Sequence, residues 1–242
     1  LDKIGSINGV TQLAVTTNGT QLASKAAALK AAGVTALNIS LDTLNADQFN
    51  AITRVGKLEQ VLAGIDAACA QGFERIRINA VFTQNAHYQT ALDLVEYAID
   101  KGVDIAFIEE MPLRHQGSKA NHDYANSQSL RSFLAKQLSL ESIALNTGGP
   151  ARYWQTSAGT RIGFISPMSH NFCGDCNRVR VTVEGRLLLC LGNEHSVDLR
   201  DLMRSTDDDQ IVRQAIIDAM GLKPERHHFD LSNDVEVVRF MS

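Results

Sequence analysis

The run RIRINAV, over Arg75–Val81, alternates polar and apolar side chains and predicts a β-strand with two different faces. Arg77 and Asn79 share one face of this strand, and the isoleucines beside them share the other. Helical patterns flank the run, at Leu58–Gln71 before it and at Tyr88–Lys101 after it. A strand between two helices is the repeating unit of a parallel α/β sheet.

The same unit recurs through the first half of the chain. A helical pattern follows each of the first three expected strands, and Gly33, Gly72 and Gly102 lie just past helices, where glycine commonly ends a helix. This order favours an α/β fold with a parallel sheet, either a barrel or a doubly wound sheet. The expected strands are Gln12–Val15, Ala36–Leu41, Arg75–Val81 and Asp104–Glu109, and the expected helices are Leu22–Ala32, Ala46–Ile52, Leu58–Gln71 and Tyr88–Lys101.

Polar residues gather where these strands end. The carboxyl ends of parallel strands are where such folds place their chemistry, so recurrent polar clusters there indicate a shared site. The alternative is that these residues only begin loops and cap the following helices. The clusters are Thr16–Gly19, Ser40–Asp42, Arg77 with Asn79, and Glu109–Pro112.

The composition changes near residue 118, where a polar stretch begins. We therefore expect two regions, a barrel part over residues 1–117 and a smaller α+β region over residues 118–242. In the second region we expect strands at Tyr153–Thr156, Arg161–Ser166, Val179–Val183 and Leu187–Cys190, and helices at Leu130–Leu138, Leu199–Arg204 and Gln210–Gly221.

Cys173, Cys176 and Cys190 indicate a metal centre, because C-x2-C followed by a third cysteine groups three thiols. Three thiolates leave one coordination position open, as an active iron-sulfur cluster requires. A fourth ligand from His170 or His195 would instead give a structural Cys3His zinc site, and the spacing leaves both open.

Arg178 and Arg180 follow the second of these cysteines and alternate onto one face of an expected strand. Two guanidinium groups beside a metal favour an anion such as phosphate, since guanidinium binds phosphate bidentately. An exposed strand with surface ion pairs is the alternative. Cys69 lies in an alanine-rich helix and is interpreted as a buried thiol rather than a ligand.

Composition excludes several classes of protein. The 242 residues carry a formal charge of −4 and have a pI near 6.0, which argues against a nucleic-acid-binding surface. No apolar run approaches the length of a membrane span, and residues 1–20 lack the pattern of a secretory signal, so we expect a cytoplasmic protein. No G-x4-G-K-[ST] loop is present. Because the chain opens with Leu1, we also expect it to be a fragment.

Six runs together resemble the molybdenum cofactor biosynthesis protein A family, the GTP 3',8-cyclases of the radical S-adenosylmethionine (SAM) superfamily. The resemblance extends along nearly the whole chain, in order and spacing, and the cysteine motif is specific. The runs are TTNG over Thr16–Gly19, NISLD over Asn38–Asp42, FERIRIN over Phe73–Asn79, FIEEMP over Phe107–Pro112, NFCGDCNRVR over Asn171–Arg180 and LLLCLG over Leu187–Gly192.

The resemblance implies a partial (β/α) TIM-like barrel holding one [4Fe-4S] cluster and a C-terminal α+β region holding a second. In that family SAM is cleaved reductively to a 5'-deoxyadenosyl radical, which takes hydrogen from ribose C3' of GTP so that C3' attacks purine C8. The product is the precursor of cyclic pyranopterin monophosphate. The implied partners are GTP, SAM, an electron donor and the cyclic pyranopterin monophosphate synthase that acts next. Whether the protein forms a homodimer is left open.

Site residues follow from the same resemblance, position by position. The second cluster would be ligated by Cys173, Cys176 and Cys190. GTP would be contacted by Thr16, Arg77, Arg178, Val179 and Arg180. SAM would be contacted by Ser40 and Met111.

The chain departs from the family pattern in two places that bear on function. The C-x3-C-x2-C motif of the SAM cluster is absent, since no cysteine precedes Cys69, so these residues alone are not expected to generate a radical. Arg77 stands where the family usually has lysine, which keeps the charge and changes its geometry. Two other classes stay open: another radical SAM enzyme with an auxiliary cluster, and a non-catalytic module with structural zinc.

Overall fold

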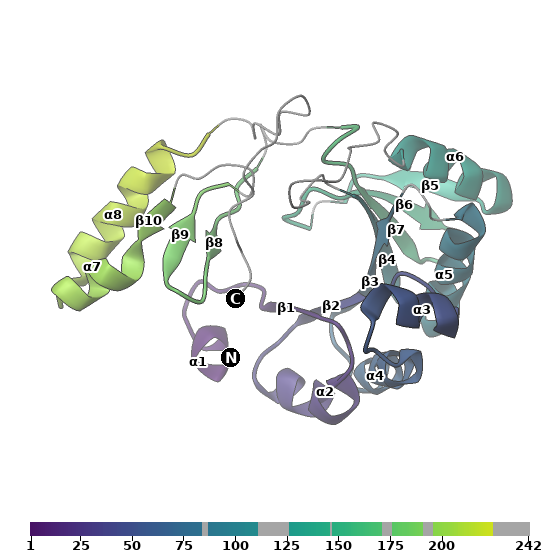
Figure 1. The fold of residues 1–242 in the computed structure, drawn as a ribbon, viewed down its shortest axis with the longest axis horizontal. Helices are drawn as coiled ribbons and strands as arrows, with labels where there is room; N and C mark the ends of the chain where they lie inside the picture. The colour runs from purple at the N-terminus through teal and green to yellow at the C-terminus, as the bar shows by residue number, and fades with distance from the viewer. Residues whose placement is uncertain (84–86, 111–125, 146, 171–175, 191–195, 225–242) are drawn as a thin grey trace. The chain divides into compact units, whose positions relative to one another are not determined.

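The computed structural model describes residues 1–83, 87–110, 126–145, 147–170, 176–190 and 196–224, which fall into two units. The first unit contains the described residues of 1–110 and 126–169, and the second contains those from residue 170 onward. Figure 1 labels their elements, and each unit is described by itself.

A seven-stranded sheet forms the first unit, in the order β1-β2-β3-β4-β7-β6-β5. Strands β1 to β4 and β7 run parallel, while β6 and β5 are antiparallel to their neighbours. The predicted α/β fold with a largely parallel sheet is therefore confirmed. The strands are β1 (Ala14–Thr17), β2 (Ala36–Ser40), β3 (Arg75–Phe82), β4 (Asp104–Glu109), β5 (Leu140–Ile143), β6 (Arg152–Thr156) and β7 (Arg161–Ile165).

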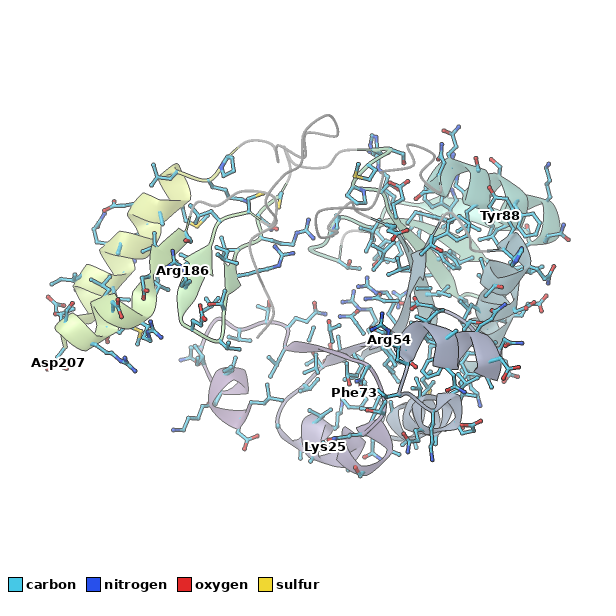
Figure 2. The ribbon with its side chains drawn as sticks, viewed as in Figure 1. Lys25, Arg54, Phe73, Tyr88, Arg186 and Asp207 are labelled. Carbon is cyan, nitrogen blue, oxygen red and sulfur yellow. The ribbon has the colours of Figure 1, made fainter. Side chains whose placement is uncertain are left out.

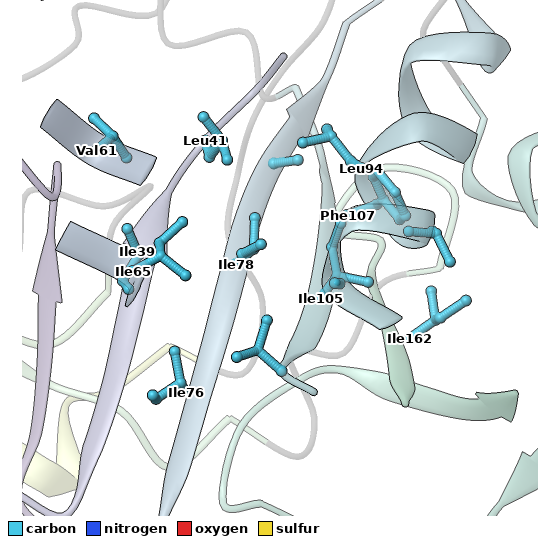
Figure 3. Packing of buried hydrophobic residues seen from close by; sticks show 14 of the residues in the cluster. Ile39, Leu41, Val61, Ile65, Ile76, Ile78, Leu94, Ile105, Phe107 and Ile162 are labelled. Atoms are coloured by element: carbon cyan, nitrogen blue, oxygen red, sulfur yellow. The ribbon is translucent and has the colours of Figure 1, made fainter. Parts of the chain in front are cut away.

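Helices cover one face of this sheet (Figure 1). Along α4, Val61, Ile65 and Ala68 recur at helical spacing and are buried against the sheet. Strand residues that alternate toward the helices, such as Ile39 and Ile78, complete this core (Figure 3). The helices are α1 (Asp2–Gly5), α2 (Leu22–Ala31), α3 (Ala46–Thr53), α4 (Leu58–Ala70), α5 (Tyr88–Lys101) and α6 (Ser127–Gln137).

The helix ends follow local rules. The Asn45 side chain accepts the Gln48 N–H at 3.0 Å and caps the start of α3. Gly102 ends α5 with a φ of 64°, in the left-handed region, as the sequence predicted for a glycine at that place. Arg54, labelled in Figure 2, ends α3 with a φ of 66° and has no such freedom. Among the described helices, none has the length and apolar character needed to cross a membrane.

The sheet extends further along the chain than the sequence indicated. Strands β6 and β7 and helix α6 were assigned to the C-terminal region beginning at residue 118, whereas the structure places them in the sheet and core of the first unit. The reason is the parallel pairing of β7 with β4, from Ile105 opposite Ile162 to Ile108 opposite Ile165. The polar composition near residue 118, which itself lies outside the described residues, does not mark the end of the sheet.

The second unit contains a three-stranded antiparallel sheet in the order β10-β9-β8, with two helices. Its small core is formed by Leu187, Leu189, Leu199 and Ala219. Strand β10 was not expected from the sequence, and β8 is shorter than the predicted Val179–Val183. The elements are β8 (Arg180–Val181), β9 (Arg186–Leu188), β10 (Ser196–Asp198), α7 (Leu199–Ser205) and α8 (Asp209–Gly221).

Glu109 joins three parts of the first unit at the end of β4, where its side chain is buried. Its carboxylate accepts the Ser127 N–H at the start of α6 at 3.1 Å. After β7 it accepts the Met168 N–H at 3.1 Å, the Ser169 N–H at 2.9 Å and the Ser169 hydroxyl. Burial by itself raises the pKa of Glu109, but these donors outweigh it, so the pKa lies below its ordinary value.

Glu109→Gln is expected to lower the free energy of unfolding by about 2–4 kcal/mol at pH 7. The new amide N–H2 group would face N–H and hydroxyl donors that now bind a carboxylate oxygen, so buried donors would lose their acceptor. The folded pKa is depressed, so the contribution of the carboxylate is present above the unfolded pKa of about 4.3 and is lost as pH falls through the folded value. Urea unfolding at pH 7 and pH 3 measures this. The difference between wild type and variant should shrink at pH 3.

Exposed Glu141 on β5 offers a matched control. Glu141→Gln should change the free energy of unfolding by less than about 0.5 kcal/mol. A Glu109→Gln difference that is as large at pH 3 as at pH 7 would contradict the assigned role of the ionised carboxylate.

Candidate active site

The sheet face opposite the described helices of the first unit, called the helix-free face below, carries a row of polar side chains across three strands. Thr16 on β1 is the register partner of Asn38 on β2, which is the register partner of Arg77 on β3. Asn38 Nδ2 donates to Thr16 Oγ1 at 3.5 Å. Because register partners point to the same side of a sheet, the three side chains share this face. The two predicted GTP contacts of the first unit, Thr16 and Arg77, are thus brought into one row, with Asn38 between them.

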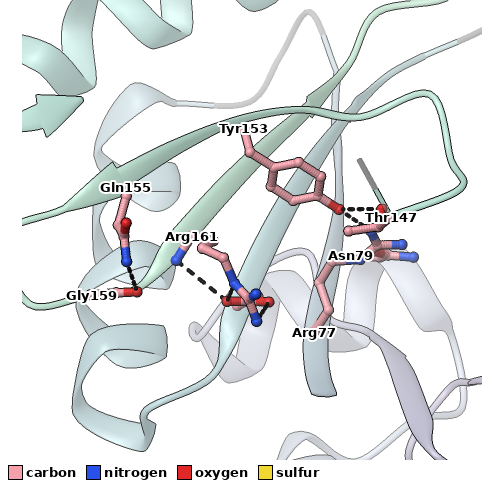
Figure 4. Close-up of polar contacts among 8 residues, drawn as sticks. Arg77, Asn79, Thr147, Tyr153, Gln155, Gly159 and Arg161 are labelled. Carbon is pink, nitrogen blue, oxygen red and sulfur yellow. Dashed lines mark hydrogen bonds and ion pairs between the residues drawn. The ribbon is translucent and has the colours of Figure 1, made fainter. Parts of the chain in front are cut away.

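Arg77 is held in place by neutral groups. Its Nε donates to Asn79 Oδ1 at 3.0 Å, and its Nη1 donates to the Tyr153 hydroxyl at 2.7 Å (Figure 4). The Tyr153 hydroxyl also lies 3.2 Å from Thr147 Oγ1. Alternation along β3 puts Arg77 and Asn79 on the same face, as the sequence predicted, with Ile76 and Ile78 buried on the other.

Asn38 presents an unused acceptor to the same face. Its Oδ1 is buried and has no hydrogen-bond partner among the described residues. A buried acceptor without a donor is costly in an isolated protein and is satisfied when a ligand supplies an N–H or O–H. The row therefore combines an acceptor, a hydroxyl and a cation, which is the chemistry needed for an anionic ligand that also carries hydroxyl groups.

Ser40 and Asp42 lie at and just beyond the end of β2. Ser40 is exposed, and it is the register partner of Asn79, so it adjoins the row. Asp42 Oδ1 accepts the Val81 N–H at 2.7 Å. Burial raises the pKa of Asp42, and the Val81 hydrogen bond lowers it by less, so the pKa lies above its ordinary value. The Asp42 carboxylate thus accepts a backbone N–H of β3 just beyond the end of β2, and this hydrogen bond ties the two strands together.

In the second unit a single ammonium connects the segments that carry two of the predicted cluster ligands. Lys223 Nζ lies 3.8 Å from Cys176 Sγ and donates to the carbonyl oxygen of Leu189 at 2.8 Å, next to Cys190. Burial raises the pKa of Cys176, but the N–H and guanidinium of Arg178 together with Lys223 outweigh it, so the thiol pKa lies below its ordinary value. An anionic sulfur is the form that ligates iron, so these residues fit an iron-sulfur cluster.

Other predicted site residues are only partly covered by the structure. Cys173, Met111 and His195 lie outside the described residues, and His170 is exposed. Within the described part of the chain, no group of three or more His, Cys, Asp or Glu side chains is arranged to hold a metal ion. Cys69 is half-buried rather than fully buried as predicted; it packs beside the core of the first unit, and burial raises the pKa of its thiol.

The three predicted GTP contacts of the second unit begin two residues after Cys176. Arg178 is half-buried, while Val179 and Arg180 are exposed. Arg180 begins β8 opposite Leu188 of β9. The expected strand over these residues is present only from Arg180.

Two residues of the site were missed by sequence reasoning. The alternation in ALNIS, over Ala36–Ser40, puts Asn38 on the face of Ser40, so the same rule that selected Arg77 and Asn79 would have found it. Tyr153 had no comparable signal, because its contact with Arg77 depends on pairing between distant segments.

Two family models match the chain. The Radical SAM superfamily model matches residues 1–98, and the Molybdenum Cofactor Synthesis C model matches residues 103–229. Among solved structures, SuiB of Streptococcus suis bound to S-adenosylmethionine has a TM-score of 0.50 at 16% identity and covers 83% of this chain and 48% of its own. SuiB bound to the precursor peptide SuiA has a TM-score of 0.51 at 14% identity, with coverage of 84% and 49%. At these identities the likeness concerns the fold alone.

Curated relatives match much more closely. A GTP 3',8-cyclase from Ectopseudomonas mendocina is 52% identical over 100% of this chain and 74% of its own length. Relatives of the same name from Saccharophagus degradans and Marinobacter nauticus are 47% and 52% identical, over 100% and 97% of this chain and 74% and 72% of their own lengths. From these relatives and the two family models together, the chain belongs to the GTP 3',8-cyclase family of radical SAM enzymes.

Proposed function

We propose that this chain provides the GTP-binding and SAM-binding residues and one set of cluster ligands of a GTP 3',8-cyclase, a lyase of molybdenum cofactor biosynthesis that cyclises GTP by SAM-dependent radical chemistry. Without a C-x3-C-x2-C motif, these 242 residues alone would not generate the radical. Family membership supports the reaction, and one structural observation supports the substrate. That observation is the row of Thr16, Asn38 and Arg77 on the helix-free face of the sheet. The Arg77 cation is held there by neutral acceptors, so its charge is available to an anion.

The residues proposed to contact GTP are those that the family resemblance implies. They are Thr16 and Arg77, and also Arg178, Val179 and Arg180. Guanidinium groups suit a triphosphate because each offers paired N–H donors with a permanent charge. The chain has no P-loop, so side chains rather than a glycine-rich backbone would bind the phosphates.

Cys173, Cys176 and Cys190 are proposed to ligate a [4Fe-4S] cluster with one open iron for the substrate. Ser40 and Met111 are proposed to contact SAM, which with its own cluster supplies the radical chemistry. No C-x3-C-x2-C motif occurs in these 242 residues, so they would not supply the ligands of that other cluster. An electron donor and the cyclic pyranopterin monophosphate synthase are the proposed partners, and the reducing cytoplasm is the compartment that suits such clusters.

Replacing Arg178 and Arg180 together with alanine should weaken GTP binding about 10- to 100-fold, since each charge-assisted contact contributes about 1.5–3 kcal/mol and truncation effects are not additive. Isothermal titration calorimetry measures the affinity, and circular dichroism checks that the variant folds.

Arg204 and Arg213 in the same unit are exposed and serve as the matched pair for charge. The double variant Arg204→Ala and Arg213→Ala should bind GTP nearly as wild type does. If the Arg178/Arg180 variant binds GTP as tightly as wild type, the two arginines do not bind phosphate. If the two double variants lose the same affinity, the loss comes from the change in net charge and not from specific contacts.

Reconstitution with iron and sulfide under anaerobic conditions should give about four irons and four sulfides per chain. Cys176→Ala and Cys190→Ala should each lower both contents, because a ligand is lost. Cys69→Ala should leave them unchanged and is the matched control. One zinc per chain without sulfide would favour the structural zinc site instead, and a loss of iron in Cys69→Ala would mean that the ligand set is misassigned.

A further inference from the structure

Tyr153 reaches Arg77 across two intervening strands. The sheet order places β4 and β7 between β3 and β6, so the backbones of the two residues are three strand spacings apart, about 14 Å. Neither side chain spans that distance alone. Their hydrogen bond, 2.7 Å from Nη1 to the hydroxyl, therefore requires both side chains to lie along the helix-free face toward each other (Figure 4).

Small residues leave room for this contact. Tyr153 is the register partner of Gly163 on β7, which is the register partner of Ala106 on β4. A Cβ atom added to Gly163 would lie 3.0 Å from Tyr153 Cε1 and 3.3 Å from the Ala106 Cβ. The Tyr153 ring thus occupies the place that larger side chains on β4 and β7 would fill.

The register also sets the height at which the two groups meet. Ala106 is the register partner of Asn79, so Tyr153, Gly163, Ala106 and Asn79 lie at one level across the sheet. Arg77 lies one side-chain repeat before Asn79 on β3 and directs its guanidinium to that level, where Asn79 and Tyr153 accept its Nε and Nη1 protons.

The acceptors leave the charge of Arg77 uncompensated. Asp104 on β4 is the register partner of Arg77, but its carboxylate binds Arg161, at 2.8 Å to Nε and 2.7 Å to Nη2. Amide and hydroxyl oxygens orient Arg77 instead, and among the described residues no carboxylate forms an ion pair with it. Its Nη2 group makes no hydrogen bond within that part of the chain.

We propose that Tyr153 is a positioning residue for substrate binding: it fixes the Arg77 guanidinium so that the remaining Nη2 group meets a phosphate group of the nucleotide. This inference rests on the proposed function, in which Arg77 contacts GTP. Tyr153 itself touches no substrate in this scheme. Its hydroxyl accepts from Arg77 and is in turn placed by Thr147, which lies 3.2 Å away.

Tyr153→Phe keeps the ring and removes only the hydroxyl, and it should weaken GTP binding about 3- to 10-fold, the usual net value of one hydrogen bond. Calorimetry on the full chain with GTP and with guanosine separates phosphate binding from base binding. The loss should be confined to GTP, because guanosine has no phosphate for Arg77 to meet.

Two further variants make the test specific. Tyr97→Phe removes a buried hydroxyl of α5 that makes no hydrogen bond to any described residue, and it should leave both affinities unchanged. Arg77→Met removes the cation, and in that background Tyr153→Phe should cause no further loss of GTP affinity. This coupling in the double-mutant cycle is what a purely structural role of Tyr153 would not produce.

The outcomes distinguish the inference from the function on which it rests. Unchanged GTP affinity in Arg77→Met would overturn the proposed Arg77 contact and the inference with it. Weaker binding in Arg77→Met with normal binding in Tyr153→Phe would overturn the inference alone. An equal Tyr153→Phe loss for GTP and guanosine, or a loss that persists in Arg77→Met, would do the same.

Discussion

The parallel pairing of β7 with β4 is the contact on which the first unit depends. It joins the strand that ends in Glu109 to the strand that precedes Met168 and Ser169, and so brings the Glu109 carboxylate to three of its donors. On the opposite face the same pairing sets Gly163 beside Ala106 and leaves room for Tyr153. One backbone pairing therefore fixes a buried anion on the helical side and an oriented cation on the other.

Two arginines of the helix-free face, Arg77 and Arg161, differ in the groups that bind them, and this difference separates a structural charge from a functional one. Arg161 binds Asp104 through two nitrogens, and this pair raises the pKa of Arg161 through hydrogen bonding to the carboxylate. Among the described residues, Arg77 is bound only by neutral acceptors, so its orientation is fixed while its charge is left for a ligand. A cation held by dipoles rather than by a counter-ion is the arrangement expected of an anion-binding site.

Much of the fold of the first unit could be predicted from the spacing of apolar residues in the sequence. Strands β2 to β4 and helices α4 and α5 match their predicted bounds within about two residues. Strand β3 and the two helices each have one buried face and so a clear period, whereas β4 is a short apolar run buried on both faces. The same alternation placed Arg77 beside Asn79 and would have placed Asn38. The β4–β7 pairing left no local trace, since it joins segments far apart in the chain, and therefore neither the extent of the sheet nor the partner of Tyr153 could be derived from the sequence.

The guanidinium of Arg77 shows why orientation matters as much as charge. A lysine at this position would carry a compact charge on a flexible stem, whereas guanidinium is planar and donates from fixed directions. Two hydrogen bonds to Asn79 and Tyr153, at different nitrogens, fix both the position and the plane of that group. The loss of side-chain freedom then occurs on folding, and binding of an anion does not incur it again. The affinity of the site thus depends in part on two acceptors that have no need to touch the ligand.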